Sequence, residues 1–528
     1  KEYLSRGTYI CPPRPSMRLI GDVAEYCFHN IPKWNPMNIC SYHLQEAGAT
    51  PEQELAYALA TAISVLDELK TRVPNGEFPE LCGRLSFFVN AGIRFVTEMC
   101  KMRAFVDLWD EILIERYGIE NPKFRRFRYG VQVNSLGLTE QQPENNVYRI
   151  LIEMLAVTLS KKARARAVQL PAWNEALGLP RPWDQQWSMR MQQIMAFETD
   201  LLEYEDLFDG NSVVDTKVEA LKTSARYELK TIESQGGALE SIDYMKSRLV
   251  ESNTLRLQNI ESKQTTVVGV NKYINTEESP LVSGDGGIMV VDPLVEKDQI
   301  DRLNKWRASR NQTTVENALN NLRKAALAGK NIMPASIEAA KAGATTGEWA
   351  QEMRNIYGEY RGPTGVAAGI SNQTEGLDEI RSAVDAVSDK LGERLKFLIG
   401  KPGLDGHSNG AEQIASRARD CGMKIEYEGI RLTPQELVDT VKTSKAHVIG
   451  LSILSGSHIP LVQDMMTLLA EEGLMNIPVV VGGIIPEEDK SKLLQMGIAK
   501  VYTPKDFEMN TIMMDIVNLA EPREIAAE

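Results

Sequence analysis

The chain has 528 residues, 43% of them hydrophobic and 25% charged, so it can bury several cores and is too long for one ordinary domain. A formal net charge of −13 argues against a nucleic-acid backbone or an anionic membrane surface as the main partner. The six cysteines include no CxxC pair, which is typical of reduced thiols in a cytoplasm, and no stretch of about 20 apolar residues predicts a membrane span.

Residues 1–205 alternate short apolar pieces with long helical segments, as in residues 51–69 and 145–159. The clearest strand-like pieces are residues 37–40, 86–89, 128–133 and 165–170. This repeat of strand, loop and helix predicts a (β/α)8 TIM-type barrel. About five or six strand-like pieces can be counted, whereas such a barrel needs eight. We therefore expect a substrate-binding barrel domain over residues 1–205 that lacks its N-terminal strands.

Residues 206–392 are mainly helical in pattern and polar. A Gly/Ser-rich break interrupts them near residues 283–287. We interpret this part as a helical connector followed by a linker.

Residues 393–528 alternate strands with helices of about 10–15 residues. Strands are predicted at residues 396–399, 424–427, 447–454, 478–481 and 500–502. Helices are predicted at residues 411–421, from 434, at 459–469, from 486 and at 507–519. This alternation indicates a parallel, doubly wound, flavodoxin-like sheet. Ligands of such sheets bind beyond the carboxyl ends of the strands.

Unusual residues follow three of these strands. They are Asp405, Gly406, His407 and Gly410 after the first strand, Ser452 and Leu454 at the end of the third, and Gly482 and Gly483 at the end of the fourth. A corrinoid that is bound without its own base needs a neutral imidazole below its cobalt. A carboxylate on the other ring nitrogen fixes the tautomer. We therefore predict that His407 binds cobalt and that Asp405 orients it. The alternative is an ordinary loop histidine among turn glycines, which would leave the three strand ends unexplained.

This segment resembles the cobalamin-binding domain shared by B12-dependent mutases, methionine synthase and corrinoid methyltransferases. The resemblance implies that Lys401 joins His407 and Asp405, as a lysine does in the mutases. Leu404 stands where methylmalonyl-CoA mutases commonly have Gln.

Further motifs resemble the adenosylcobalamin-dependent acyl-CoA mutase family. They are PRPSMR at residues 13–18, SYHLQEAGA at 41–49, RLSFF at 84–88 and VVGVNKY at 267–273. The family implies adenosylcobalamin as cofactor and a carbon-skeleton rearrangement of an acyl-CoA, in which the thioester group migrates between adjacent carbons. The cofactor supplies the radical chemistry, and the protein supplies positioning and electrostatics.

The resemblance also implies roles for individual residues. Arg6 matches the arginine that holds the free carboxylate, His43 the histidine bonded to the thioester carbonyl, and Tyr42 the residue against corrin and substrate. Arg84 and Ser86 match positions near the CoA phosphates and pantetheine, and Gln132 and Glu175 match positions near the substrate and the adenosyl ribose. Simpler interpretations exist: a surface ion pair of Arg6 with Glu2, a buried structural His43, a solvated Arg84, and a capping or paired Glu175.

Departures from the family pattern concern the substrate. Gly130 stands where methylmalonyl-CoA mutases have a histidine, and residues 168–173 lack their His-Thr-Asn run. Together with residues 8–13, these features resemble the ethylmalonyl-CoA mutase branch, which interconverts ethylmalonyl-CoA and methylsuccinyl-CoA. Loss of an imidazole makes room for another carbon, and such contacts discriminate by about 1–3 kcal/mol per methylene. Methylmalonyl-CoA mutase is the alternative within the family. A non-catalytic cobalamin carrier or sensor would leave Arg6, Tyr42 and His43 without a role.

Family members have a long segment before the position of Lys1, which carries the first barrel strands. From the 528 residues alone we expect no closed barrel, and full activity would be surprising. The family implies a homodimer, and a reactivating chaperone is a further partner that the resemblance leaves open.

Overall fold

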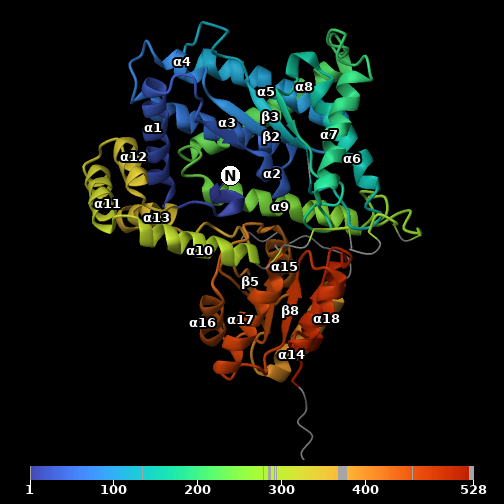
Figure 1. The fold of residues 1–528 in the computed structure, drawn as a ribbon. Helices are drawn as coiled ribbons and strands as arrows, with labels where there is room; N and C mark the ends of the chain where they lie inside the picture. The colour runs from blue at the N-terminus through green and yellow to red at the C-terminus, as the bar shows by residue number, and fades with distance from the viewer. Residues whose placement is uncertain are drawn as a thin grey trace, which may run out of the picture.

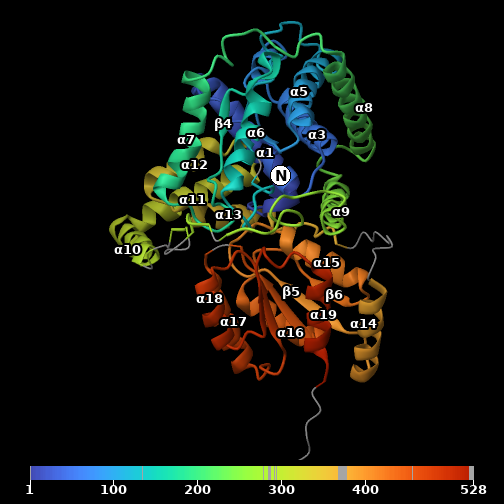
Figure 2. The same cartoon turned by 90° about the vertical axis from the view of Figure 1, so that its right-hand side faces the viewer.

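The computed structural model describes residues 2–133, 135–277, 279–282, 287–289, 292, 294–366, 377–454 and 456–522. Residues 283–286 of the expected Gly/Ser-rich break lie outside the described residues. The described chain forms two parallel sheets, one in an N-terminal unit and one in a C-terminal unit. The two units are stacked on each other (Figure 1), and a turn of 90° shows the same arrangement (Figure 2).

The N-terminal sheet has four parallel strands in the order β1-β2-β3-β4. They are β1 (Asn38–Cys40), β2 (Ser86–Ala91), β3 (Tyr129–Val133) and β4 (Ala167–Gln169). All four strand-like pieces chosen from the sequence are therefore confirmed as strands. The described residues of this unit contain no further strand, which is fewer than the five or six expected.

Helices follow the strands of this sheet. They are α2 (Tyr42–Glu46), α3 (Pro51–Lys70), α4 (Phe78–Cys82), α5 (Phe95–Glu115), α6 (Asn145–Thr158), the 3-10 turn η2 (Lys161–Ala163) and α7 (Pro182–Phe197). Before them lie η1 (Glu2–Arg6) and α1 (Pro13–Asn30). Helix α3 begins where the sequence predicts, because Thr50 caps it reciprocally with Gln53 and Pro51 occupies its first turn.

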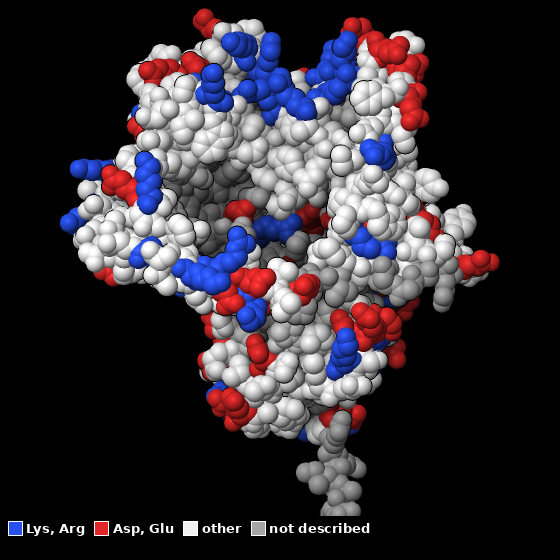
Figure 3. Space-filling model, viewed as in Figure 1, with Lys and Arg blue, Asp and Glu red and all other residues white. Residues whose placement is uncertain are grey.

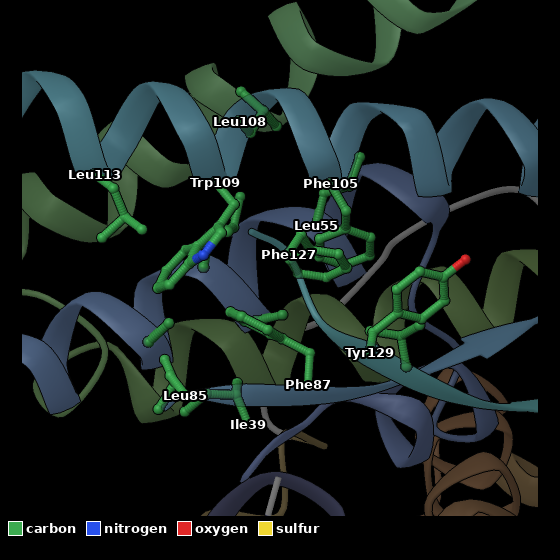
Figure 4. Close-up of a cluster of buried hydrophobic side chains, with 14 of the residues drawn as sticks. Ile39, Leu55, Leu85, Phe87, Phe105, Leu108, Trp109, Leu113, Phe127 and Tyr129 are labelled. Carbon is green, nitrogen blue, oxygen red and sulfur yellow. The ribbon is translucent and has the colours of Figure 1, made fainter. Parts of the chain in front are cut away.

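The two faces of this sheet have different surroundings. Phe87 and Tyr129 point from β2 and β3 into a core closed by Phe105 and Trp109 of α5 (Figure 4). Because side chains alternate along a strand, the neighbouring residues of β2 and β3 face the other way. The register pairs Phe88 with Gly130 and Asn90 with Gln132 on that second face.

A helical region connects the two units. It contains α8 (Ser212–Ser234), α9 (Ile242–Glu261), α10 (Leu294–Ser309), α11 (Gln312–Leu327), α12 (Met333–Ala342) and α13 (Thr346–Tyr357). Helix α8 packs Val214 and Leu221 into the core of the N-terminal sheet, and α9 packs Leu249 against Leu44 and Tyr57. The N-terminal core thus extends beyond residue 205.

The C-terminal sheet has the strand order β6-β5-β7-β8-β9, and all its strands are parallel. The strands are β5 (Lys396–Gly400), β6 (Lys424–Tyr427), β7 (Val448–Ser452), β8 (Val479–Gly482) and β9 (Lys500–Tyr502). The helices are α14 (Leu377–Leu391), α15 (Asn409–Asp420), α16 (Pro434–Ser444), α17 (His458–Glu471), α18 (Glu487–Gln495) and α19 (Met509–Ala520). The predicted doubly wound, flavodoxin-like sheet is confirmed. Its strand order reverses at β5, the usual place of a ligand.

The two sheets meet at their carboxyl edges. Helix α2 follows β1, the loop at residues 401–408 follows β5, and Asn409 at the end of that loop donates through Nδ2 to the backbone oxygen of Glu46. Helices α9 and α15 reinforce this contact (Figures 1 and 2). Within the described ranges, no helix is long and apolar enough to cross a bilayer.

Candidate functional site

Asp405 is the centre of the loop after β5. One of its oxygens, Oδ2, lies 2.5 Å from Nζ of Lys401 and accepts from the backbone N–H of Leu454 at 3.1 Å. The other, Oδ1, lies 2.7 Å from Nδ1 of His407 and accepts from the backbone N–H of the same residue at 3.0 Å. Burial opposes ionisation, but the bonds from His407 and the ion pair with Lys401 hold the pKa of Asp405 well below its usual range.

This loop fits the group that the sequence predicts. Because an ionised Asp405 accepts at Nδ1, the imidazole carries its proton there, and Nε2 keeps a lone pair for a metal. The His407 side chain is 46% exposed, whereas Lys401 behind it is completely buried. Burial lowers the pKa of Lys401 against the opposing effect of Asp405. His407, Asp405 and Lys401 thus form one hydrogen-bonded series with the Nε2 side of the imidazole at its exposed end.

The predicted glycines are not equivalent. A Cβ on Gly406 would lie 2.3 Å from the backbone oxygen of Arg6, and one on Gly483 would lie 1.8 Å from that of Ile453. Close approach by the protein's own backbone therefore requires glycine at these two positions. At Gly410 and Gly482 the nearest atoms would be 3.7 and 4.0 Å away, which is ordinary van der Waals contact, so the protein's own packing does not require glycine at these two positions.

Ser452 and Leu454 border the same edge. Ser452 ends β7 and is paired in register with Gly482 of β8. The backbone oxygen of Ser452 accepts from Nζ of Lys401 at 3.3 Å. The structure therefore brings the residues chosen from β5, β7 and β8 to one edge of the sheet.

Tyr42 and His43 begin α2, directly at the carboxyl end of β1. Their ring centroids lie 3.6 Å apart, and Tyr42 meets the edge of Phe88 at 5.2 Å. Burial, and secondarily Glu46, raise the pKa of Tyr42 to about 12, so this phenol stays protonated at neutral pH. His43 is 7% exposed. The two rings form an aromatic wall at the edge that faces the C-terminal unit.

Arg6 lies beside this wall and pairs with Glu46 at 2.7 Å. The two side chains are only 15% and 14% exposed, so this ion pair of Arg6 lies mostly out of contact with solvent. Glu46 also accepts from Oγ of Ser135 at 3.0 Å. Burial, and then the negative charge of Glu46, raise the pKa of Glu175 to about 7. Arg6, Tyr42, Glu46, Ser135 and Glu175 therefore form one polar cluster.

Two members of this cluster were not predicted from the sequence. Glu46 stands four residues after Tyr42, a spacing that places both on one face of α2, but this five-residue helix is itself not evident from the sequence. Ser135 follows β3, and nothing in its sequence context distinguishes it.

Gly130 and Gln132 lie on the second face of β3. A Cβ on Gly130 would lie 3.0 Å from Cδ2 of Phe88, so the Phe88 ring occupies the space beside the glycine. Gln132 is 8% exposed and is level with Asn90 in the sheet. This face lies behind the aromatic wall of Tyr42 and His43.

Arg84 and Ser86 lie at the opposite, amino end of β2. Arg84 pairs with Glu80 at 2.8 Å and lies 4.4 Å over the Phe28 ring, and Oγ of Ser86 donates to the backbone oxygen of Met37 at 3.1 Å. At about 3.3 Å per residue, β2 separates them from the Tyr42 edge by roughly 16 Å. The structure therefore does not bring these two residues together with the other predicted site residues.

The surface of the N-terminal unit is hollowed on the face seen in Figure 3, and acidic and basic side chains lie at the bottom of the hollow. Among the described residues, no group of three or more His, Cys, Asp or Glu side chains could hold a metal ion.

Comparison with known proteins agrees with this arrangement. Residues 1–359 match the family model described as methylmalonyl-CoA mutase, and residues 395–506 match that of the B12 binding domain. An ethylmalonyl-CoA mutase of Cereibacter sphaeroides is 70% identical over 528 residues, which cover 100% of this chain and 81% of the relative. An ethylmalonyl-CoA mutase of Methylorubrum extorquens is 60% identical, covering 99% and 76%. A methylmalonyl-CoA mutase of Escherichia coli is 33% identical, covering 98% and 72%. The chain therefore belongs to the methylmalonyl-CoA mutase family, and its residues 395–506 form a B12 binding domain.

Proposed function

We propose that the protein is an adenosylcobalamin-dependent mutase that converts ethylmalonyl-CoA to methylsuccinyl-CoA. The observation that carries this function is the contact between the two carboxyl edges. Gly406, next to the cobalt-binding His407, lies directly against the backbone of Arg6. The identity of 70% to an ethylmalonyl-CoA mutase, against 33% to a methylmalonyl-CoA mutase, supports the substrate.

When bound, adenosylcobalamin supplies the radical chemistry of the rearrangement. His407 would hold its cobalt through Nε2, with Asp405 and Lys401 fixing the orientation of the ring. Gly410 and Gly482, beside Ser452, would let the displaced nucleotide tail approach the backbone closely, because glycine has no side chain.

The cluster on the opposite edge would hold the acyl group. The guanidinium of Arg6 is suited to the free carboxylate, because it is always charged and can bind a carboxylate through two N–H groups. His43 would donate to the thioester carbonyl and stabilise the group that migrates. Tyr42 would cover the acyl group and exclude water, and Gln132 and Glu175 would contact the substrate and the ribose.

The separation of Arg84 and Ser86 from this cluster is consistent with a long substrate. The CoA arm would run along the second face of β2, with its phosphates at the amino end and its thioester at the carboxyl end. The roughly 16 Å between these ends is the length over which a pantetheine chain extends. Arg84 is 13% exposed and already oriented by Glu80, as a phosphate-binding residue would need to be.

Gly130 would determine the choice of acyl group. A glycine lets the Phe88 ring lie against β3, whereas a histidine there would push the ring toward Tyr42. The displaced ring would take up the room that the additional carbon of an ethyl group needs. Such a change alters discrimination by about 1–3 kcal/mol.

The test is turnover by the full-length protein with adenosylcobalamin and ethylmalonyl-CoA, with the product identified by chromatography and mass spectrometry. Formation of methylsuccinyl-CoA is the expected result. A non-catalytic cobalamin carrier or sensor would bind adenosylcobalamin and form no product, and that outcome would refute the function.

The family further supports a cytoplasmic homodimer, in which the N-terminal unit extends beyond residue 205 into α8 and α9. Sedimentation at micromolar concentration should give twice the 58.9 kDa of the chain. We also propose a reactivating chaperone as a protein partner. If the purified protein alone sustained turnover without losing activity, no chaperone would be needed.

A further inference from the structure

A completely buried group of charges lies directly behind α2. Nζ of Lys101 on α5 is 2.6 Å from Oε2 of Glu54 on α3 and 2.6 Å from Oε2 of Glu98 on α5. The exposed fractions of the three side chains are 0%, 0% and 3%. We call these three residues the buried charge cluster.

The cluster holds the two strand ends from which the site projects. Oε1 of Glu54 accepts from Oγ of Ser41 and from the backbone N–H of Asn90, both at 2.9 Å. Nζ of Lys101 donates to the backbone oxygen of Asn90 at 2.8 Å. Ser41 is the N-cap residue of α2, and Asn90 is the second-last residue of β2. Glu54 and Lys101 therefore tie the ends of β1 and β2 together.

Two further bonds reach α2 itself. Nδ2 of Asn90 donates to the backbone oxygen of Tyr42 at 3.3 Å, and Nε2 of Gln45 donates to Oε1 of Glu98 at 3.4 Å. A helix of only five residues has little hydrogen bonding of its own and cannot fix its orientation alone. Its direction is set by these bonds from behind and by Arg6 and Ser135 in front.

Stability alone is a poor explanation for such a cluster. Taking an ammonium and two carboxylates out of water costs several kcal/mol per ion, and replacing a buried ion pair by apolar side chains is often neutral or stabilising. An apolar replacement, however, would leave Ser41 and both backbone groups of Asn90 without partners. The cluster is therefore suited to holding an orientation.

We propose that Lys101 and Glu54 are positioning residues that fix Tyr42 and His43 at the carboxyl edge of the sheet. The expected effect on catalysis rests on the proposed function. The expected effect on the order of α2 rests on the hydrogen bonds alone. Neither residue touches the substrate. Both act through Ser41, Asn90 and the α2 backbone.

The structural test is amide hydrogen exchange of the peptide containing residues 41–49 in Lys101→Met. The control is Arg103→Met, on the same helix two residues further. Arg103 is 7% exposed, pairs with Asp206 at 2.7 Å and donates to Ser160 at 2.9 Å, so it is also a buried cation but lies away from α2. Exchange of the peptide should rise at least tenfold in Lys101→Met and less than threefold in Arg103→Met. Equal exchange in the two variants would overturn the inference.

The functional test compares turnover of the same variants with adenosylcobalamin and ethylmalonyl-CoA. The kcat of Lys101→Met should fall by at least tenfold with a smaller change in KM, and cobalamin binding should be unchanged. The triple variant Glu54→Gln/Glu98→Gln/Lys101→Met keeps a side-chain oxygen for Ser41 and Asn90 and leaves no carboxylate of the buried charge cluster unpaired. It should recover most of the lost kcat.

Ser41→Ala removes a single donor and tests the inference should the Lys101 variants fail to fold. Its kcat should fall several-fold with a melting temperature within a few degrees of the parent. A kcat that follows melting temperature alone across all these variants would contradict the positioning role. A parent protein without turnover would contradict the proposed function, and the exchange comparison would still decide on the cluster.

Discussion

Asp405 connects the predicted cobalt ligand His407 to the buried Lys401. Four donors from three residues converge on its two oxygens, so its charge and its geometry are both fixed. The carboxylate opposes the loss of charge that burial favours at Lys401, and it accepts from Nδ1 of His407. Loss of its charge would disturb both neighbours at once.

Asp405→Asn should weaken binding of adenosylcobalamin about 10–100-fold, the usual effect of removing the partner of a metal-binding histidine. The asparagine keeps the size of the side chain but loses the charge that Lys401 needs. Titration followed by cobalamin absorbance measures the change. Asp439→Asn, at an exposed position of α16, is the control and should bind normally. Equal affinities in the two variants would exclude an orienting role for Asp405.

Glu175 predicts a pH dependence of stability. Its pKa is raised from 4.5 to about 7 by burial and by Glu46. Because the folded-state pKa is above the unfolded value, this stability is fully present below about pH 4 and is lost as the pH rises through about 7. Glu175→Gln removes the ionisation, so its melting temperature should fall less than that of the parent between pH 5 and 8. The expected difference in unfolding free energy is on the order of 1–3 kcal/mol. Parallel curves for the two proteins would contradict the assignment.

Gly130→His tests whether this single residue selects between ethylmalonyl-CoA and methylmalonyl-CoA. The imidazole would displace the Phe88 ring, whose nearest atom lies 3.0 Å from the position of a Cβ. The ratio of kcat/KM for ethylmalonyl-CoA over methylmalonyl-CoA should fall about 10–100-fold, corresponding to about 1–3 kcal/mol. Gly137→His, where only one atom lies within 4 Å of a Cβ, serves as the control. A ratio unchanged by Gly130→His would mean that substrate choice lies elsewhere.

At the scale of elements, helices and strands could be predicted where the sequence itself contains a helix cap or a short strand pattern between turns. Helices α3 and α16 begin at capping boxes that are visible in the sequence, Thr50 with Gln53 and Thr433 with Glu436. The strands of the C-terminal sheet are short and bounded by turns. The predicted bounds of each strand agree with the observed bounds to within a few residues. Helix α2 was not predicted, because five residues show no periodicity and its form depends on contacts from distant segments.

Thr433→Ala should lower the melting temperature of the C-terminal unit, because an N-cap contributes about 1 kcal/mol. The Thr433 side chain accepts from the backbone N–H of Glu436 at 3.2 Å, and the Glu436 carboxylate accepts from the backbone N–H of Thr433 at 2.8 Å. Thr443→Ala, at an exposed position near the end of the same helix, is the matched control. Calorimetry should show a loss of several degrees for the first variant and almost none for the second.

At the scale of the molecule, the site exists only where the two units meet. The sequence predicted the His407 loop from its own spacing. In the polar cluster, Arg6, Tyr42 and Glu175 were named only through the family resemblance, and Glu46 and Ser135 required the fold. The members of this cluster come from four separate segments and are joined by ion pairs and burial that no local pattern shows. The same holds for Glu54 and Lys101, which look like ordinary helix-surface charges in the sequence.

Helices α9 and α15 contribute one of the contacts between the two units. Lys246 and Glu412 form an ion pair there, with side chains only 3% and 4% exposed. Lys246→Met would leave Glu412 buried and unpaired, which costs about 3–5 kcal/mol. Calorimetry should then show the two units unfolding at more widely separated temperatures, and Lys246→Met/Glu412→Leu should restore the parent behaviour. An unchanged profile for the single variant would show that other contacts hold the units together.

The most direct measurement is a competition between equal concentrations of ethylmalonyl-CoA and methylmalonyl-CoA for the full-length protein with adenosylcobalamin. Both products are quantified together by mass spectrometry, so differences in protein activity between assays cancel. We predict that methylsuccinyl-CoA forms at least tenfold faster than succinyl-CoA. Faster formation of succinyl-CoA would contradict the proposed substrate, and formation of neither product would contradict the proposed reaction.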